Sequence, residues 1–147
     1  MTIKHAVLLI PSILLLSCTS TPPDAAASAA YLEKAAAAPG AIRTPSGLVY
    51  RELRAGTGTS PAATDTVKVN YRGTLVDGKK FDSNDGIKFP LNGVIPCWTE
   101  GVQKMKVGGK SELVCPSTIA YGPTGMPPDI PGGATLVFEI ELLGIGQ

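Results

Sequence analysis

Apolar and polar residues alternate along several short segments between residue 48 and the C-terminus. Apolar and polar residues alternate over residues 66–72, so that one face carries the apolar side chains of Val67, Val69 and Tyr71. Such alternation predicts a half-buried antiparallel strand. Residues 136–142 repeat the pattern, with Leu136, Phe138, Ile140 and Leu142 on one face. Residues 48–53 and 110–115 are predicted as two further strands.

One segment of this region has a helical pattern. Trp98, Val102 and Met105 are spaced to share one helical face, Pro96 is suited to the first turn, and Gly108-Gly109 are predicted to end the helix. Asp77-Gly78 is typical of a hairpin turn. One short helix against an antiparallel sheet of about five strands predicts an α+β fold in which the sheet half-wraps the helix.

The first residues have the layout of a secretory signal. Residues 1–17 combine a short basic start with a largely apolar run over residues 6–16, which is too short to span a bilayer. The run ends in Leu15-Leu16-Ser17-Cys18, which resembles a bacterial lipobox. That resemblance implies cleavage before Cys18 and a lipid on Cys18. Thr19 follows in place of Asp, which implies an outer-membrane lipoprotein facing the periplasm. The alternative is an ordinary signal followed by an incidental cysteine.

An Ala-rich segment, residues 18–41, separates this signal from the domain predicted over residues 42–147. Nine of the 14 residues from Ala25 to Ala38 are Ala. Residues 28–38 favour a short helix, which would be marginal in isolation. The alternative is a disordered spacer between membrane and domain, and the sequence leaves both open.

Composition narrows the chemistry. The chain has 147 residues with 13 basic and 12 acidic side chains, so nucleic acid is not expected as a partner. His5 is the only His, and it lies in the predicted signal. The mature domain therefore lacks Ser-His-Asp or Cys-His catalysis and His-ligated metals, and we expect neither metal nor cofactor. Most of the eight aromatic residues fall in predicted strands, on the helix or beside loops, namely Tyr71, Phe81, Phe89, Trp98, Tyr121 and Phe138. As a set they would line an apolar cavity between helix and sheet.

Several motifs resemble one family in the same order along the chain. They are residues 69–73 (Val-Asn-Tyr-Arg-Gly), 77–83 (Asp-Gly-Lys-Lys-Phe-Asp-Ser), 93–101, 120–122 and 134–143. Together they resemble the FKBP-type peptidyl-prolyl cis-trans isomerases, and residues 39–50 are similar to the macrophage-infectivity-potentiator branch. The resemblance implies a five- to six-stranded antiparallel sheet half-wrapped around one short helix. The long dimerisation helix of that branch has no room here, so we expect a monomer.

The resemblance also implies a proline-binding pocket and roles for its residues. Candidate catalytic residues are Tyr71, Phe81, Asp82, Tyr121 and Phe138. Candidate substrate-binding residues are Val94, Ile95, Trp98 and Ile130. Trp98 would form the floor, and Tyr121 and the Ile95 backbone N–H would donate hydrogen bonds to substrate carbonyls. Ile87, Met126 and Asp129 depart from the commonest family residues, which leaves sequence preference and macrolide affinity open.

The implied activity is acceleration of X-Pro isomerisation during the folding of exported proteins. The implied partners are unfolded proline-containing chains, macrolide inhibitors and, through the lipid, the membrane. The alternative is a non-catalytic chaperone or peptide-binding module of the same fold. With Cys18 acylated in an oxidising periplasm, Cys97 and Cys115 are predicted to form a disulfide. The alternative is two buried free thiols.

Overall fold

A computed structural model describes residues 23–146; the predicted signal peptide and Cys18 lie outside the described residues. The helices are α1 (Pro23–Ala36) and α2 (Pro96–Val102), with 3-10 turns η1 (Leu91–Gly93) and η2 (Ser117–Ile119). The strands are β1 (Ala41–Arg43), β2 (Val49–Arg54), β3 (Thr66–Leu75), β4 (Lys80–Pro90), β5 (Lys110–Cys115) and β6 (Leu136–Ile145).

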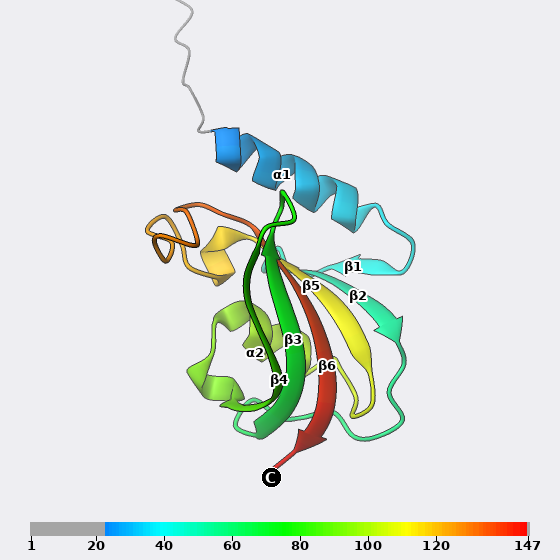
Figure 1. Ribbon diagram of the computed structural model, residues 1–147. Coiled ribbons are helices and arrows are strands. Elements are labelled where there is room, and N and C mark those ends of the chain that lie inside the picture. The colour runs from blue at the N-terminus through cyan, green and yellow to red at the C-terminus, as the bar shows by residue number, and fades with distance from the viewer. Residues whose placement is uncertain (1–22, 147) are drawn as a thin grey trace, which may run out of the picture.

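The described strands form one antiparallel sheet of six, in the order β1-β2-β5-β6-β3-β4. The sheet curves around α2, while α1 lies across one end of the molecule (Figure 1). The predicted fold class and the four predicted strands are confirmed, and the hairpin turn lies at Gly78, whose φ is 89°. The three-residue edge strand β1 was not predicted, since it is too short to show a period.

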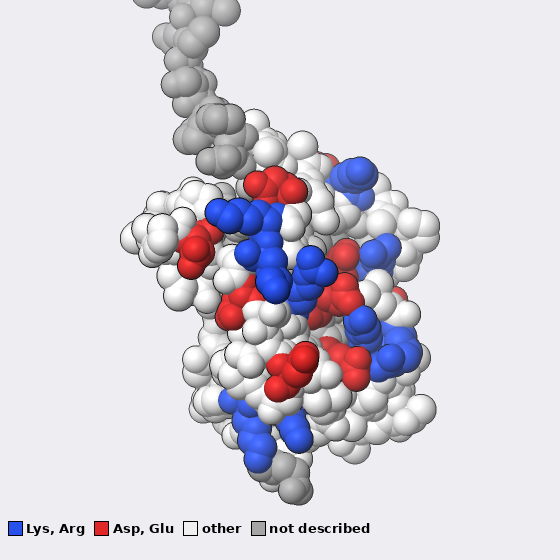
Figure 2. Space-filling model, in the orientation of Figure 1, with Lys and Arg blue, Asp and Glu red and all other residues white. Residues whose placement is uncertain are grey.

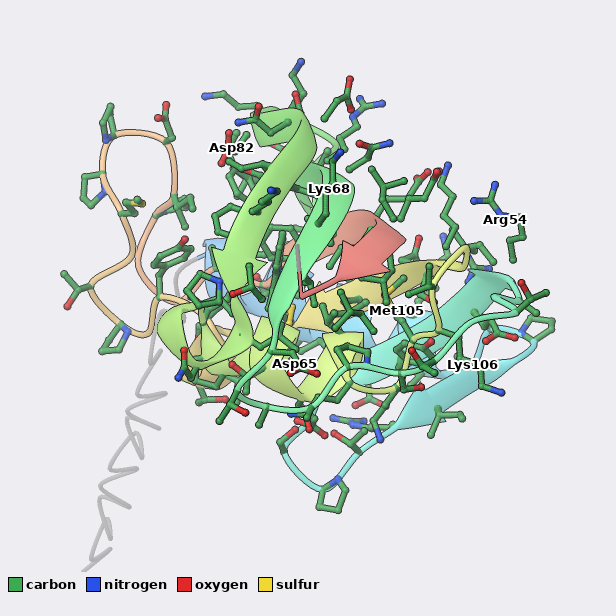
Figure 3. All side chains as sticks on the ribbon, turned by 90° about the horizontal axis from the view of Figure 1, so that it is seen from below. Arg54, Asp65, Lys68, Asp82, Met105 and Lys106 are labelled. Atoms are coloured by element: carbon green, nitrogen blue, oxygen red, sulfur yellow. A yellow bond between two sulfur atoms is a disulfide. The ribbon has the colours of Figure 1, made fainter. Side chains whose placement is uncertain are left out.

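The core fills the space between α2 and the inner face of the sheet. The alternating apolar residues of β3 and β6 point inward and are buried, as the pattern predicted. Trp98, Val102 and Met105 meet them from the other side, and Met105 is only 1% exposed (Figure 3). The apolar side chains of the strands and of the helix therefore pack together in one hydrophobic core.

Helix α2 is shorter than the sequence predicted. It ends at Val102 and not at Gly108-Gly109. Beyond it the chain tightens into turns, with Lys104 N–H donating to Gly101 O and Met105 N–H to Val102 O. Met105 still reaches the core from this turn, which is why its spacing imitated a longer helix.

Gly101 lets α2 approach the sheet closely. A Cβ at this position would lie 2.2 Å from Leu113 Cδ2 in β5. Real Cβ atoms do not come that close to other heavy atoms, so a side chain here would push the helix off the strand. Because α2 supplies Trp98, the position of the helix sets the position of the candidate site.

Helix α1 begins at Pro23, earlier than predicted, and it lies on the domain. Ser28 is buried and Tyr31 and Leu32 are half-buried, and the three share one helical face. The Ser28 Oγ accepts a 3.1 Å hydrogen bond from the Thr135 N–H, and Arg43 pairs with Glu33 at 2.7 Å. Residues 23–36 are therefore helical and docked on the domain.

The surface carries no large area of one charge on the face that Figure 2 shows. Lys, Arg, Asp and Glu are interspersed over the outer side of the sheet. The Lys110–Glu139 ion pair joins the neighbouring strands β5 and β6 there, and Arg54–Glu141 joins β2 to β6 across β5. Within residues 23–146, neither helix is long and apolar enough to cross a membrane.

Candidate active site

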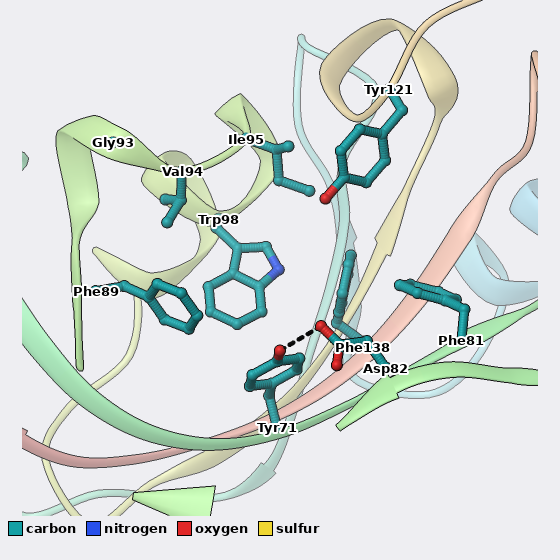
Figure 4. A pocket seen from close by; sticks show the side chains of 10 residues that line it. All are labelled: Tyr71, Phe81, Asp82, Phe89, Gly93, Val94, Ile95, Trp98, Tyr121 and Phe138. Carbon is teal, nitrogen blue, oxygen red and sulfur yellow. Dashed lines mark hydrogen bonds between the residues drawn. The ribbon is translucent and has the colours of Figure 1, made fainter. Parts of the chain in front are cut away.

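A cavity of about 350 Å³ opens between α2, the curved sheet and the loop after η2 (Figure 4). Its lining is mainly aromatic and aliphatic, with one carboxylate. The lining residues are Tyr71, Phe81, Asp82, Phe89, Gly93, Val94, Ile95, Trp98, Tyr121 and Phe138. Concave, mostly apolar sites with a few polar groups are typical of small-ligand binding.

Trp98 forms the base of the cavity because the first turn of α2 turns its ring toward the sheet. The indole is 4% exposed and packs edge-to-face against Tyr71, Phe89 and Phe138, at centroid distances of 5.0, 5.5 and 5.3 Å. Its Nε1–H is buried without an N or O partner in residues 23–146. Figure 4 shows the indole nitrogen on the side toward Phe138. The face of an aromatic ring is electron-rich and can weakly accept an N–H.

Phe81 and Phe138 form one wall. Their rings pack edge-to-face at 86° with centroids 5.6 Å apart. Phe138 comes from the inward face of β6 and is 3% exposed, whereas Phe81 comes from edge strand β4 and is partly buried. The two strands that carry these rings lie on either side of β3.

Tyr71 and Asp82 form the polar pair of the site. The Tyr71 hydroxyl donates to Asp82 Oδ2 at 2.5 Å. Burial, followed by the hydrogen bond and the negative charge of Asp82, raises the pKa of Tyr71 to about 12. Tyr71 therefore stays protonated at neutral pH, and its proton is committed to Asp82.

Besides Trp98, two lining residues carry donors that have no acceptor among residues 23–146. The Tyr121 hydroxyl points inward in Figure 4 and has no hydrogen-bond partner in residues 23–146. Burial and the nearby Asp82 charge raise the pKa of Tyr121, so its hydroxyl stays neutral. The Ile95 N–H, just before α2, likewise makes no backbone hydrogen bond within the described chain. Both groups are free to meet carbonyl oxygens of a bound peptide.

The structure brings together eight of the nine residues that the family resemblance assigned to the pocket. Ile130 is the exception: it is 3% exposed, and it packs in the buried core while forming a bridge with Met126. Phe89 and Gly93 also line the cavity. Phe89 belongs to the aromatic set that was expected to line an apolar cavity, but neither residue was among the nine assigned to the pocket. The Phe89 side chain follows the alternation of β4, which was the available signal, whereas Gly93 lines the cavity without a side chain.

A disulfide joins Cys97 of α2 to Cys115 at the end of β5, with Cα atoms 5.8 Å apart. Both residues are fully buried. The bond ties the helix residue next to Trp98 to the neighbouring sheet. Within residues 23–146, no group of three or more His, Cys, Asp or Glu side chains is placed to hold a metal ion.

The chain is similar in sequence to known proteins. The sequence model of the FKBP-type peptidyl-prolyl cis-trans isomerases matches residues 57–143. The chain is 49% identical to the FKBP-type isomerase FkpA of Escherichia coli K12 over 119 residues, which is 78% of this chain and 44% of FkpA. It is 41% identical to the outer membrane protein MIP of Legionella longbeachae over 120 residues, covering 79% of this chain and 52% of that protein.

A solved structure is similar over its whole length. The peptidyl-prolyl cis-trans isomerase of Pseudomonas syringae has a TM-score of 0.80 and 39% identity, covering 87% of this chain and 99% of that one. The chain spans about half the length of the curated relatives described above. The sequence match, the six-stranded sheet and the solved structure agree, and the chain belongs to the FKBP-type peptidyl-prolyl cis-trans isomerase family.

Proposed function

We propose that this chain catalyses cis-trans isomerisation of X-Pro peptide bonds. The observation that carries the proposal is the aromatic cavity over Trp98, with two unpaired hydrogen-bond donors at its edge. Its size suits a proline ring with its flanking carbonyls. Family membership and the names of the relatives agree with this activity.

The chemistry needs no nucleophile. Amide resonance gives rotation about a peptide bond a barrier of ~18–20 kcal/mol, and uncatalysed X-Pro isomerisation takes roughly 10–100 s at 25 °C. The twisted amide is less charge-separated than the planar one. An apolar cavity over Trp98 therefore favours the twisted state relative to water.

The unpaired donors would hold the twisted peptide. Tyr121 would donate its hydroxyl to one carbonyl, and the Ile95 N–H would donate to another. Tyr71 and Asp82 are engaged with each other, so their role is to fix the ring and the carboxylate at the cavity edge. Phe81, Phe138 and Val94 would enclose the proline ring.

Replacing Tyr121 by Phe is expected to lower kcat/KM about tenfold, the value of one hydrogen bond made in a dry site. The ring stays, so the cavity keeps its shape. Relaxation of a proline tetrapeptide from cis to trans, followed with and without protein, measures the effect. Tyr31→Phe, on α1 outside the cavity, is the matched control and should match wild type. Equal rates for Tyr121→Phe and wild type would remove Tyr121 from the mechanism.

Isomerisation is expected to change by less than about twofold between pH 6 and 8, since no proton is transferred. A raised tyrosine pKa means that the protonated form persists to higher pH. The stability contributed by protonated Tyr71 is fully present below pH 10 and is lost only as the pH rises through about 12. A bell-shaped profile near neutrality, on a peptide without ionising groups, would indicate general acid catalysis instead.

The proposed setting is the bacterial envelope. The signal-like residues 1–17 and Cys18 support a lipoprotein anchored to the outer membrane and facing the periplasm. A relative is named an outer membrane protein. The substrates would then be exported proline-containing proteins during folding, and macrolides would compete for the cavity. We propose a monomer, as the sequence predicted.

Cys18→Ser is expected to abolish lipid labelling. A clickable fatty acid fed to cells producing the full chain should label wild type strongly and Cys18→Ser at background. Cys97→Ala is a control for cysteine loss as such and should retain the label. Equal labelling of wild type and Cys18→Ser would exclude the proposed anchor.

A further inference from the structure

Gly73 lies where three strands meet. In β3 it is opposite Asp82 of β4 and opposite Phe138 of β6. It is buried, as is Tyr71 two residues earlier, so both positions face the interior of the curved sheet. Its φ is not in the left-handed region, and the backbone would accept an L side chain. A conformational need for glycine therefore does not account for this position.

The space above Gly73 is filled by the two rings of the cavity wall. A Cβ at 73 would lie 2.6 Å from Phe81 Cζ, 2.9 Å from Phe81 Cε2 and 2.9 Å from Phe138 Cε1. Contacts this short do not occur, so at least one ring would have to move. These are the rings that pack edge-to-face at 5.6 Å.

We propose that Gly73 is a positioning residue of the candidate active site: the absence of a side chain leaves the space in which Phe81 packs on Phe138. The inference rests on the proposed isomerase function for its consequence in catalysis. Gly73, which has no side chain, thereby determines the shape of one wall of the cavity.

Phe81 is the ring that would yield. Phe138 is 3% exposed and packs on Trp98 as well, whereas Phe81 is partly buried on edge strand β4. Moving Phe81 outward would widen the cavity and disturb Asp82, the next residue, which holds Tyr71. A methyl group at 73 thus acts on catalysis through Phe81.

A double-mutant cycle tests this chain of effects. Gly73→Ala is expected to lower kcat/KM for a proline tetrapeptide about tenfold, since small displacements in a site are costly. In a Phe81→Leu background, which removes the closest obstruction and leaves only the 2.9 Å approach to Phe138 Cε1, the same change should cost less than about threefold. Gly144→Ala is the control, because a Cβ there meets no atom within 4 Å. Equal losses in both backgrounds, or no loss in wild type, would overturn the inference.

Wild type, Gly73→Ala, Phe81→Leu and the double variant are also unfolded in urea. This measurement tests the packing of the cavity wall independently of catalysis. Positions 73 and 81 should be coupled in unfolding free energy whether or not the chain is an isomerase. If wild type does not accelerate isomerisation, the proposed function fails. The coupling measured in urea then tests by itself whether Gly73 makes room for Phe81. If Gly73→Ala does not fold, adding Phe81→Leu should restore folding. Additive stabilities, or a double variant that also fails to fold, would contradict the proposal.

Discussion

Replacing Trp98 by Leu is expected to lower kcat/KM about 100-fold, the size of loss that misplacement of a bound substrate produces. The indole holds Tyr71, Phe89 and Phe138 at their edge-to-face distances, so a smaller side chain lets all three rings shift inward. The proline ring would lose its base and part of its walls at once. A peptide isomerisation assay measures the effect.

The control for this prediction is another buried aromatic residue. Tyr50 is 5% exposed, lies in β2 away from the cavity, and accepts a hydrogen bond from Ser111 at 2.9 Å. Tyr50→Leu should lower the unfolding free energy while kcat/KM stays near wild type. If Trp98→Leu and Tyr50→Leu lost activity equally, the loss would report weakened folding and not a damaged site.

Removing the Cys97–Cys115 disulfide is expected to lower the unfolding free energy by about 3 kcal/mol, as the chain-entropy model gives for a loop near this size. The bond closes a loop across 18 positions and ties α2 to β5. Urea unfolding of Cys97→Ala/Cys115→Ala against oxidised wild type measures it. A loss of helix packing next to Trp98 would lower activity as well.

A reductant distinguishes the effect of the disulfide bond from the effect of replacing the cysteine side chains. Dithiothreitol should destabilise wild type and leave the double Ala variant unchanged. Thiol titration of unfolded, unreduced protein should find neither Cys97 nor Cys115 reactive. Two reactive thiols in that sample would show that the cysteines are buried but free.

The strands were predictable because their signal is local. Alternation over seven residues located β3 and β6, and their inward faces became two walls of the core. Edge strand β1 covers three residues, which is too few for a period, and it pairs with β2 only because the loop between them closes. Local pattern therefore determined the centre of the sheet better than its edge.

The parts that the sequence missed depend on contacts between distant residues. Ser28 meets Thr135 across 107 positions, so nothing near Ser28 indicates that α1 docks. Met105 is buried like a helical residue although α2 ends at Val102, and the turn that carries it has no separate sequence signal. Ile130, predicted to bind substrate, is buried in the core and is not among the residues that line the cavity.

Most of the candidate site was reached through the family resemblance, whereas its shape required the structure. The edge-to-face contacts of Trp98, the pairing of Tyr71 with Asp82 and the unpaired Tyr121 hydroxyl are geometric facts. Gly73 illustrates the difference most clearly. Its residue type appears in the sequence, but the two rings that occupy its space come from β4 and β6.

Exchange NMR on a proline peptide tests the central claim most directly, because it observes the cis and trans forms at equilibrium without a coupled protease. With catalytic amounts of the full chain, cis–trans exchange peaks should appear at mixing times where the peptide alone gives none. A macrolide that fills the cavity over Trp98 should abolish them. Binding of the peptide to this cavity with no exchange peaks would contradict the account and leave a peptide-binding module of the same fold.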